Sequence, residues 1–352
     1  MKSRVVSLGS LKLGGDNPVR VQSMTNTLTR DRDATLSQIE TLSSLGSELV
    51  RVAVPDRQSA KALKEICESS PVPIVADIHF NSQLAILAME AGASGVRINP
   101  GNIGGPSKVR EVAKAAMANG AAIRVGVNTG SLDTEISQKF GRGPQAMVES
   151  ALKYTELIED MGMENLKVSL KASSVEATIQ AARLWDSLSD IPQHLGVTEA
   201  GDLISAVAKS AVAMGVLLME GIGDTIRVSI TGDPSDEVRA AYEILRATGR
   251  RQRGVEFISC PTCGRCEIDL AALLKDVKLR LSDILTPIKV AVMGCVVNGP
   301  GEAKDADLGV AGSKGGGTLF VKGEKIKDLP FESLAAELEK FARDLVAEKA
   351  RE

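Results

Sequence analysis

Short runs of β-branched and apolar residues alternate with longer segments of helical periodicity along the first two thirds of the chain. The strand candidates begin at eight positions: Val19, Glu48, Pro73, Gly95, Ala122, Leu166, His194 and Thr225. The segments between them place apolar residues three or four positions apart, as a helix with one buried face does. Alternating strands and helices predict parallel pairing through right-handed crossovers. Eight such units favour a (β/α)8 TIM barrel, of fold class α/β, over a doubly wound sheet, whose glycine-rich dinucleotide loop the sequence lacks.

The pattern changes after the eighth unit. A polar stretch with a glycine at each end, 249–254, is predicted to link a barrel domain over 1–248 to a smaller domain over 255–352. In the second domain the periodicity predicts a strand that leads into Cys260, a helix, two further strands and a final amphipathic helix. We therefore expect a small α+β domain after the barrel.

The composition is that of an ordinary globular protein. Of the 352 residues, 43% are hydrophobic and 25% are charged, which argues against disorder and against a collagen-like repeat. The 42 basic and 45 acidic residues give a net charge of −3, without the basic excess that binding to nucleic acid phosphates favours. No segment approaches the roughly 20 apolar residues that span a bilayer, and the first residues lack the apolar core of a signal peptide. We expect a cytoplasmic protein with no nucleic-acid or membrane partner.

Polar residues gather at the carboxyl ends of the predicted strands, where the active sites of such barrels lie. Four arginines and one lysine from five strands make this end positive, and guanidinium groups pair with phosphate oxygens in a bidentate manner. The expected ligand is a phosphorylated or diphosphorylated small molecule, although any single arginine could instead pair with a neighbouring carboxylate. The residues predicted at this end are Arg51, Asp77, His79, Arg97, Asn99, Arg124, Asn128, Ser169, Lys171, Glu199, Arg227 and Ser229.

Three titratable residues among the strands are candidates for different roles. Glu199 ends an otherwise apolar strand that faces the basic residues, which makes it the candidate for proton transfer. A salt bridge from Glu199 to Arg227 or Arg51 is the alternative. His79 could act as an acid, a base or a phosphate partner. His194 begins its strand, so we expect a structural role for it at the opposite end of the barrel.

The cysteines are unevenly placed. Four of the five lie close together in the second domain: Cys260, Cys263, Cys266 and Cys295. Thiolates two residues apart, with a distant fourth ligand, can hold either zinc or an iron–sulfur cluster. The glycine-rich sequence after Cys295 also carries Glu302, whose carboxylate could bind iron and has no use in a structural zinc site. We favour iron–sulfur, with zinc as the alternative, and expect the isolated Cys67 to be a small core residue.

Several of these segments resemble a known family, the bacterial 4-hydroxy-3-methylbut-2-en-1-yl diphosphate synthases, which are iron–sulfur enzymes of the non-mevalonate isoprenoid pathway. The resemblance extends over nearly the whole chain. Each segment is short, but together and in this order they are specific. They are VQSMTNT at Val21, ADIHF at Ala76, RINPGNIG at Arg97, RVGVN at Arg124, SLKAS at Ser169, LGVTEAG at Leu195, ISCPTCGR at Ile258 and GCVVNGPGEAKDADLG at Gly294.

The resemblance implies a reductive ring opening and dehydroxylation of 2-C-methyl-D-erythritol 2,4-cyclodiphosphate to (E)-4-hydroxy-3-methylbut-2-en-1-yl diphosphate. Two electrons would pass singly through a [4Fe-4S] cluster from flavodoxin or ferredoxin. The family's ligand set of three cysteines and one glutamate maps onto Cys260, Cys263, Cys295 and Glu302, and Glu302 would also serve catalysis. Cys266, which spacing alone would choose as the fourth thiolate, would lie outside this set, because a closed four-thiolate site leaves no iron open to substrate.

A homodimer is expected from geometry and from the resemblance. A helix of about fifteen residues after the eighth strand would carry the linker roughly 22 Å back from the mouth of the barrel. Because a six-residue linker is not expected to return a cluster to that mouth, each cluster domain is expected to cover the barrel of the other subunit.

Two other functions remain open from the sequence. One is a diphosphate-binding module whose second domain is held by structural zinc. The other is a phosphate-sugar aldolase in which Lys171 forms a Schiff base, which leaves the four clustered cysteines without a role.

Overall fold

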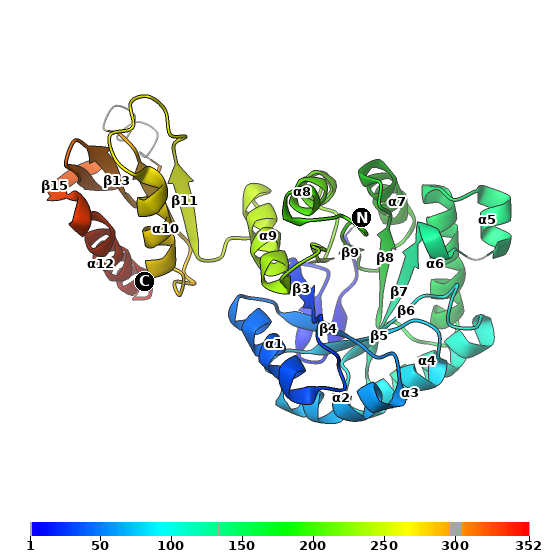
Figure 1. The fold of residues 1–352 in the computed structure, drawn as a ribbon. Coiled ribbons are helices and arrows are strands. Elements are labelled where there is room, and N and C mark those ends of the chain that lie inside the picture. Colours follow the sequence, from blue (N-terminus) through cyan, green and yellow to red (C-terminus); the bar gives the residue numbers. More distant parts are fainter. Residues whose placement is uncertain (1, 133, 296–304, 352) are drawn as a thin grey trace. The chain divides into compact units, whose positions relative to one another are not determined.

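The computed structural model describes residues 2–132, 134–295 and 305–351. The chain falls into two units, and the boundary between them in the sequence follows Arg251 (Figure 1). Each unit has its own sheet, its own helices and its own buried apolar cluster. They are described separately below.

Eight parallel strands form the sheet of the first unit. Their order is β8-β7-β6-β5-β4-β3-β10-β9, and a bridge between Val168 and Gln193 nearly closes the ring. The strands are β3 (Arg20–Met24), β4 (Leu49–Ala53), β5 (Ile74–Ile78), β6 (Gly95–Ile98), β7 (Ala122–Asn128), β8 (Leu166–Lys171), β9 (His194–Leu195) and β10 (Thr225–Ile226). The expected (β/α)8 TIM barrel is therefore confirmed, although the last two strands are shorter than the sequence pattern suggested.

Helices follow the strands and surround the sheet (Figure 1). They are α1 (Arg32–Ser44), α2 (Arg57–Ser69), α3 (Ser82–Glu90), α4 (Pro106–Asn119), α5 (Thr134–Phe140), α6 (Pro144–Glu159), α7 (Val175–Leu188), α8 (Leu203–Met219) and α9 (Pro234–Ala247). Several begin at a side chain that accepts a hydrogen bond from a backbone N–H of the first turn, as Asp56, Ser174 and Asp202 do. Within the described ranges, no helix combines the length and hydropathy needed to cross a bilayer.

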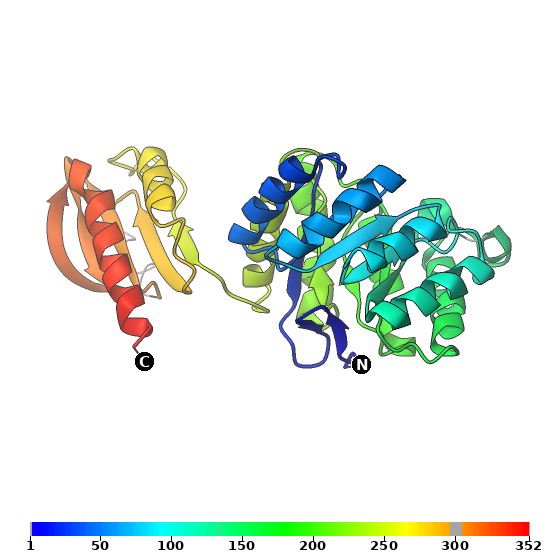
Figure 2. The same ribbon diagram turned by 90° about the horizontal axis from the view of Figure 1, so that it is seen from below.

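A short hairpin before the barrel was not predicted. It consists of β1 (Val6–Leu8) and β2 (Leu11–Leu13), and it lies beside the N-terminus in Figure 2. Val6, Leu8 and Leu13 are buried against side chains near the amino ends of β4, β5 and β7. The hairpin thus closes the amino-terminal end of the barrel and leaves the carboxyl-terminal end for a site.

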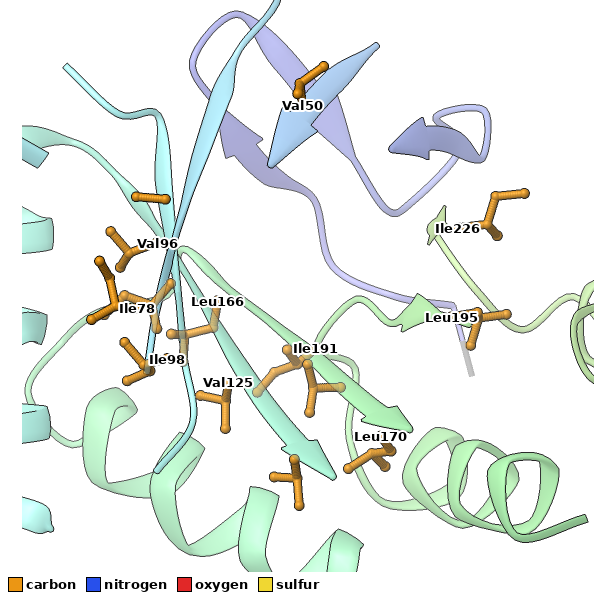
Figure 3. Packing of buried hydrophobic residues seen from close by; sticks show 14 of the residues in the cluster. Val50, Ile78, Val96, Ile98, Val125, Leu166, Leu170, Ile191, Leu195 and Ile226 are labelled. Atoms are coloured by element: carbon orange, nitrogen blue, oxygen red, sulfur yellow. The ribbon is translucent and has the colours of Figure 1, made fainter. Parts of the chain in front are cut away.

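The strands of the barrel are apolar on their outer face, and towards their carboxyl ends they are polar on their inner face. Because successive side chains of a strand point to opposite sides, the two faces can differ completely. The outward residues join helix residues in one buried cluster, and Figure 3 shows several of them: Val50, Ile78, Val96, Ile98, Val125, Leu166 and Ile226. The inward neighbours of these residues include Arg51, Asp77, Arg97 and Arg124. The main apolar core therefore lies between strands and helices.

The described part of the second unit contains a mixed sheet and the helices α10 and α12, in agreement with the expected small α+β domain. The strand order is β11-β12-β13-β14-β15, in which the first three are parallel and the last two antiparallel. The elements are β11 (Val255–Ser259), α10 (Leu270–Arg280), β12 (Ile288–Met293), β13 (Leu308–Ser313), β14 (Gly316–Val321), β15 (Glu324–Pro330) and α12 (Phe331–Lys349). The sequence pattern missed β13, which contains glycines, and β15, a charged edge strand of the kind that opposes edge-to-edge pairing.

Candidate active site

A polar pocket of about 490 Å³, part of it open to solvent, lies at the carboxyl ends of the barrel strands. Ten of the twelve residues predicted at this end line it, and the eleventh lining residue is Thr198. The lining is Arg51, Asp77, His79, Arg97, Arg124, Asn128, Ser169, Lys171, Thr198, Arg227 and Ser229. They come from seven of the eight strands or from the residues just after them, so parallel strand ends alone bring them together.

Asp77 connects three of the basic side chains. Its Oδ1 lies 3.6 Å from Arg97 Nη1, and its Oδ2 lies 3.2 Å from His79 Nε2 and 4.0 Å from Arg51 Nε. Burial by itself would raise the pKa of this carboxyl, but Arg51, His79 and Arg97 outweigh burial and hold its pKa well below the usual range. Asp77 is therefore ionised at neutral pH and orients the cations around it.

Arg227 is held by a carboxylate that the sequence analysis did not identify. Glu237, buried in the first turn of α9, accepts from Arg227 Nη2 at 2.7 Å and from Arg227 Nε at 3.0 Å. The hydroxyl of Ser23 donates to the same carboxylate at 2.9 Å, and the Ile230 N–H donates at 3.2 Å. This bidentate pair fixes one edge of the guanidinium.

Two glycines make room for the buried cations. A Cβ at Gly126 would lie 2.5 Å from Arg97 Nε, so the guanidinium of Arg97 crosses the strand at the one place without a side chain. A Cβ at Gly196 would lie 2.5 Å from Lys171 Nζ and 2.5 Å from the Arg227 carbonyl oxygen. A side chain at either position would displace a pocket residue.

Positive charge exceeds negative charge in this pocket. Five arginine and lysine side chains line it, whereas the carboxylates in contact with them are Asp77 and Glu237. Burial, with further contributions from Arg124, Arg51, Arg227 and Arg97, lowers the pKa of Lys171 well below its usual value. Burial likewise lowers the pKa of Arg51 to about 10, partly offset by Asp77. An anionic ligand with several oxygens would relieve this repulsion.

Beneath the pocket the barrel interior holds further polar residues that the sequence analysis missed or misplaced. Gln22 accepts from Arg124 Nη1 at 3.2 Å, and Lys167 stands beside Arg124 in the register of β7 and β8. Lys167 is fully buried, and burial followed by Arg124 and Arg51 lowers the pKa of its amine well below the usual value. His194, expected at the opposite end of the barrel, is buried within it, and its Nδ1 lies 2.8 Å from Thr225 Oγ1.

Glu199 and Asn99 were predicted at the mouth but lie outside the pocket lining. Glu199 is exposed, and its φ of 53° places it in the left-handed region that non-glycine residues seldom adopt. Among the described residues, Arg227 pairs with Glu237 and Arg51 contacts Asp77, so the suggested salt bridge of Glu199 to either arginine is not what the structure has. Asn99 is buried, and its Oδ1 accepts from the Gly101 N–H at 3.1 Å, which shapes the loop after β6.

The cysteines of the second unit lie at the ends of two neighbouring parallel strands. Ser259 is in register with Val292, so Cys260 and Cys295 both follow strand ends at the same edge of the sheet. The Gly294 N–H donates to Cys260 Sγ at 3.3 Å, which ties the two loops together. Glu302, the expected fourth ligand, lies outside the described residues, as does the rest of 296–304.

The donor set suits a metal cluster, but those of its members that the structure describes are not assembled around a common point. Among the described residues no group of three or more cysteine, histidine or carboxylate side chains could already hold a metal ion. Cys260 and Cys295 are half-buried and Cys263 is exposed. Two cysteines that follow neighbouring strand ends, with Cys263 in the loop after the first, provide the soft ligands that iron–sulfur clusters use. The chemistry of the site therefore fits the expected group.

The remaining cysteines occupy different surroundings. The Cys266 thiol lies 3.2 Å from the Ile268 carbonyl oxygen, to which it donates, and its side chain packs against the core of the second unit. A Cβ at Gly294 would lie 2.5 Å from Cys266 Sγ, so Cys266 fills space beside the other thiols. Cys67 packs against the core of the barrel, as expected, and burial raises the pKa of its thiol to about 12.

Comparison with known proteins agrees with both units. Residues 3–242 match the GcpE TIM-barrel domain, and residues 256–344 match the GcpE protein C-terminal domain. The chain belongs to the GcpE family. GcpE relatives include the 4-hydroxy-3-methylbut-2-en-1-yl diphosphate synthase (flavodoxin) of Lawsonia intracellularis, which is 55% identical over 93% of this chain and 92% of the relative. The Geobacter sulfurreducens protein of the same name is 50% identical over 99% of both chains. The resemblance inferred from the short motifs is thus confirmed.

Solved structures show a more distant likeness, which covers about 70% of this GcpE protein. A truncated 3-deoxy-D-arabino-heptulosonate 7-phosphate synthase from Thermotoga maritima aligns with a TM-score of 0.50, at 16% identity, over 71% of this chain and 92% of its own. Dihydropteroate synthase from Xanthomonas albilineans gives a TM-score of 0.50 at 14% identity, over 70% and 99% of the respective chains. At this level of identity the likeness concerns the fold alone.

Proposed function

We propose that this GcpE protein is a 4-hydroxy-3-methylbut-2-en-1-yl diphosphate synthase, an oxidoreductase of isoprenoid precursor biosynthesis. The observation that carries the proposal is the pocket with its excess of positive charge, in a chain that aligns over nearly its full length with relatives of that name. The reaction opens the ring of 2-C-methyl-D-erythritol 2,4-cyclodiphosphate at a carbon–oxygen bond. It consumes two electrons and a proton, and a hydroxyl group leaves as water.

The barrel pocket is the proposed substrate site. Its arginines and lysine would bind the diphosphate oxygens, with Asp77 and Glu237 fixing the directions in which Arg97 and Arg227 donate. Asn128, Ser169 and Ser229 add neutral hydrogen-bonding groups to the same lining. His79 is half-exposed at its edge and hydrogen-bonded to Asp77, which suits a group that contacts both ligand and solvent.

The second unit is the proposed redox domain. Cys260, Cys263, Cys295 and Glu302 would hold a [4Fe-4S] cluster, through which the two electrons enter one at a time. A carboxylate is a harder ligand than a thiolate, so Glu302 would exchange more readily than the cysteines do. We propose Cys266 as a neighbour outside the ligand set, because its thiol already donates to the Ile268 carbonyl oxygen.

Glu199 is the proposed proton donor or acceptor, with Glu302 as the second carboxylate near the chemistry. Thr198, which precedes Glu199 in the sequence, lines the pocket. A modest movement of the loop after β9 would therefore bring the Glu199 carboxylate to the mouth. The left-handed φ of Glu199 supports this role, since strained residues persist where function requires them.

The proposed assembly is a homodimer that receives electrons from flavodoxin, with ferredoxin as the other candidate. In the first unit, α9 runs back from the mouth for 14 residues, or about 21 Å, and Arg251 after it donates to the Val19 carbonyl oxygen just before β3, so the first unit ends at the amino ends of its strands. A two-fold arrangement would deliver each cluster domain to the barrel of the partner. The cytoplasm, where thiols stay reduced, is the proposed compartment.

Anaerobic turnover tests this function. Purified protein with a reconstituted cluster should convert the cyclodiphosphate to the hydroxymethylbutenyl diphosphate when reduced flavodoxin is supplied. It should be brown and contain iron and sulfide in equal amounts. Colourless protein that binds zinc and the cyclodiphosphate, but does not turn over, would instead indicate a binding module.

The subunit arrangement has its own test. Mixing Cys263→Ser subunits with Glu199→Gln subunits should restore activity, because half of the composite sites in a heterodimer are then intact. Failure to restore it, despite demonstrated subunit exchange, would show that each site is built within one chain.

A further inference from the structure

Arg51 is held by a sulfur atom, whereas Arg227 is held by a carboxylate. Met24 ends β3 and stands directly opposite Arg51 in the parallel register of β3 and β4. Its Sδ accepts from Arg51 Nε at 3.0 Å and from Arg51 Nη2 at 2.9 Å. Among the described side chains, Asp77 supplies the carboxylate of Arg51, with its Oδ2 4.0 Å from Nε, beyond hydrogen-bond distance. The thioether thus contacts the Nε–Nη2 edge of the Arg51 guanidinium, the same edge that the Glu237 carboxylate contacts on Arg227.

The two partners have different consequences for the charge. A carboxylate pairs with a guanidinium and cancels its charge, whereas a thioether is a weak, neutral acceptor. Sulfur on the Nε–Nη2 edge fixes the direction of the group but leaves its positive charge in place. The Nη1 end, which sulfur does not contact, keeps its N–H groups available to the pocket that Arg51 lines.

We propose that Met24 is a positioning residue for Arg51: its thioether orients the guanidinium without neutralising it, so that Arg51, which shares the Asp77 carboxylate with Arg97 and His79, presents its Nη1 end to a diphosphate oxygen of the substrate. The inference rests on the proposed function for the identity of that substrate. It assigns different tasks to two arginines of one pocket, since Arg227 forms a bidentate pair with Glu237, whereas Arg51 lies 4.0 Å from a carboxylate that two other cations share.

The alternative role for Met24 is packing. Two substitutions distinguish the roles, because each role predicts a different order of substrate affinity for them. Leucine has nearly the volume of methionine but no acceptor, so Met24→Leu preserves packing and removes the sulfur contact. Glutamine is of similar length and supplies a neutral carbonyl acceptor, so Met24→Gln preserves an acceptor at some cost in packing. A positioning role predicts that glutamine retains more substrate affinity than leucine, and a packing role predicts the reverse order.

The experiment measures the dissociation constant of the cyclodiphosphate by calorimetry, and kcat and KM by anaerobic turnover, on the cluster-loaded protein. We expect Met24→Leu to weaken binding threefold to tenfold, the range for loss of a neutral hydrogen bond, with kcat changed less than twofold. Met24→Gln should stay within about threefold of the wild type. The matched control is Met89→Leu at a buried methionine of α3 that is not part of the pocket lining, and this variant should bind as the wild type does.

A double substitution shows whether Met24 acts through Arg51. Once Arg51→Met has removed the guanidinium, Met24→Leu should weaken binding by less than twofold more. Wild-type affinity in Met24→Leu would overturn the proposal. The proposal would also be overturned if the loss of affinity in the double variant equalled the product of the losses in Met24→Leu and Arg51→Met. These two results decide the matter even if Met24→Gln does not fold.

Inorganic diphosphate, used as a second ligand, separates this inference from the proposed function. Suppose that the wild-type protein does not turn over the cyclodiphosphate, but that Met24→Leu binds inorganic diphosphate more weakly than the wild type does. This result would contradict the enzyme assignment and support the positioning role. Normal turnover by the wild type, together with equal ligand affinity in Met24→Leu and the wild type, would support the enzyme assignment and overturn the positioning role.

Discussion

The barrel mouth and the cysteine edge of the second unit are both built at the carboxyl ends of parallel strands, but they differ in how far the chain alone assembles them. At the mouth, ten predicted residues line one pocket, and Asp77 and Glu237 hold the neighbouring arginines in fixed directions. At the cysteine edge, two strand ends bring Cys260 close to Gly294, yet no three described ligands share a point.

The difference follows from the elements that carry the side chains. Strand residues have fixed positions in a hydrogen-bonded sheet, so Arg97 and Arg124 are placed by register. The thiols lie in loops after strands, where backbone hydrogen bonds determine less. A metal site commonly becomes ordered when its ligands bind the ion, and binding then adds to stability. The comparison therefore predicts a preformed substrate pocket and a metal-dependent redox site.

The largest expected effect is that of Cys263→Ser, which should remove turnover but leave substrate binding nearly intact. Loss of a proposed ligand should abolish turnover and reduce the bound iron, whereas affinity for the cyclodiphosphate should change less than about threefold, because the pocket forms without the cluster. Iron and sulfide analysis, turnover and calorimetry provide the measurements. Cys266→Ser is the matched control and should retain both iron and activity. Equal loss of iron in the two variants would contradict the ligand assignment.

The next effect concerns Glu199. Glu199→Gln should lower kcat by about 10²–10⁴-fold, the usual contribution of acid–base catalysis, and should leave binding nearly unchanged. Glu199→Gly should lose as much activity but gain up to about 1 kcal/mol in the free energy of unfolding, because glycine relieves the left-handed backbone at φ 53°. Turnover, calorimetry and thermal unfolding distinguish these effects. A loss of binding in Glu199→Gln, without a fall in kcat, would indicate a substrate contact instead of proton transfer.

A smaller effect is expected when a single pocket arginine is replaced. Methionine keeps much of the stem packing but removes the donors, so Arg97→Met or Arg124→Met should weaken substrate affinity about tenfold to a hundredfold, as expected for a charged hydrogen bond. Stability should change less than affinity. The control is Arg183→Met, which removes an exposed arginine paired with Glu220 on the outer helices and should leave affinity intact. Unchanged affinity across variants of Arg51, Arg97, Arg124, Lys171 and Arg227 would refute the barrel-mouth site.

The smallest effect is on stability, through Lys167. A buried amine whose pKa lies well below 10.5 binds fewer protons in the folded than in the unfolded state, so its contribution to stability becomes less unfavourable as the pH rises towards 10.5. Lys167→Met should therefore raise the free energy of unfolding at neutral pH, by about 1–4 kcal/mol, and this gain should shrink towards pH 10.5.

Denaturant unfolding at several pH values measures the effect of Lys167→Met. The control is Lys61→Met, on the exposed side of α2, which should show no such pH dependence. A destabilised Lys167→Met protein at neutral pH would mean that the amine has a compensating partner when the pocket is in its working state.

Much of the fold could be predicted from the sequence because hydrophobic periodicity reports directly on which face of an element is buried. All eight barrel strands follow the predicted order, and a two-residue spacing is enough to put Asp77 and His79 on a common side of the chain, where they are in contact. The same alternation could have identified Lys167, which shares a strand face with Ser169 and Lys171 in the segment LKVSLK. The hairpin of β1 and β2 was missed because each strand has only three residues, too few for a period to show.

The sequence by itself determined the strand order, the gathering of cations at one end and the family, since these depend on local patterns and on short motifs in a fixed order. The partners of those cations were decided by tertiary structure. Nothing local connects Glu237 to Ser23, or Met24 to Arg51, because each pair spans at least one whole strand–helix unit or the closure of the barrel. Hydrogen-bond partners across such separations are fixed only when parallel register and barrel closure bring their strands and helices within contact distance.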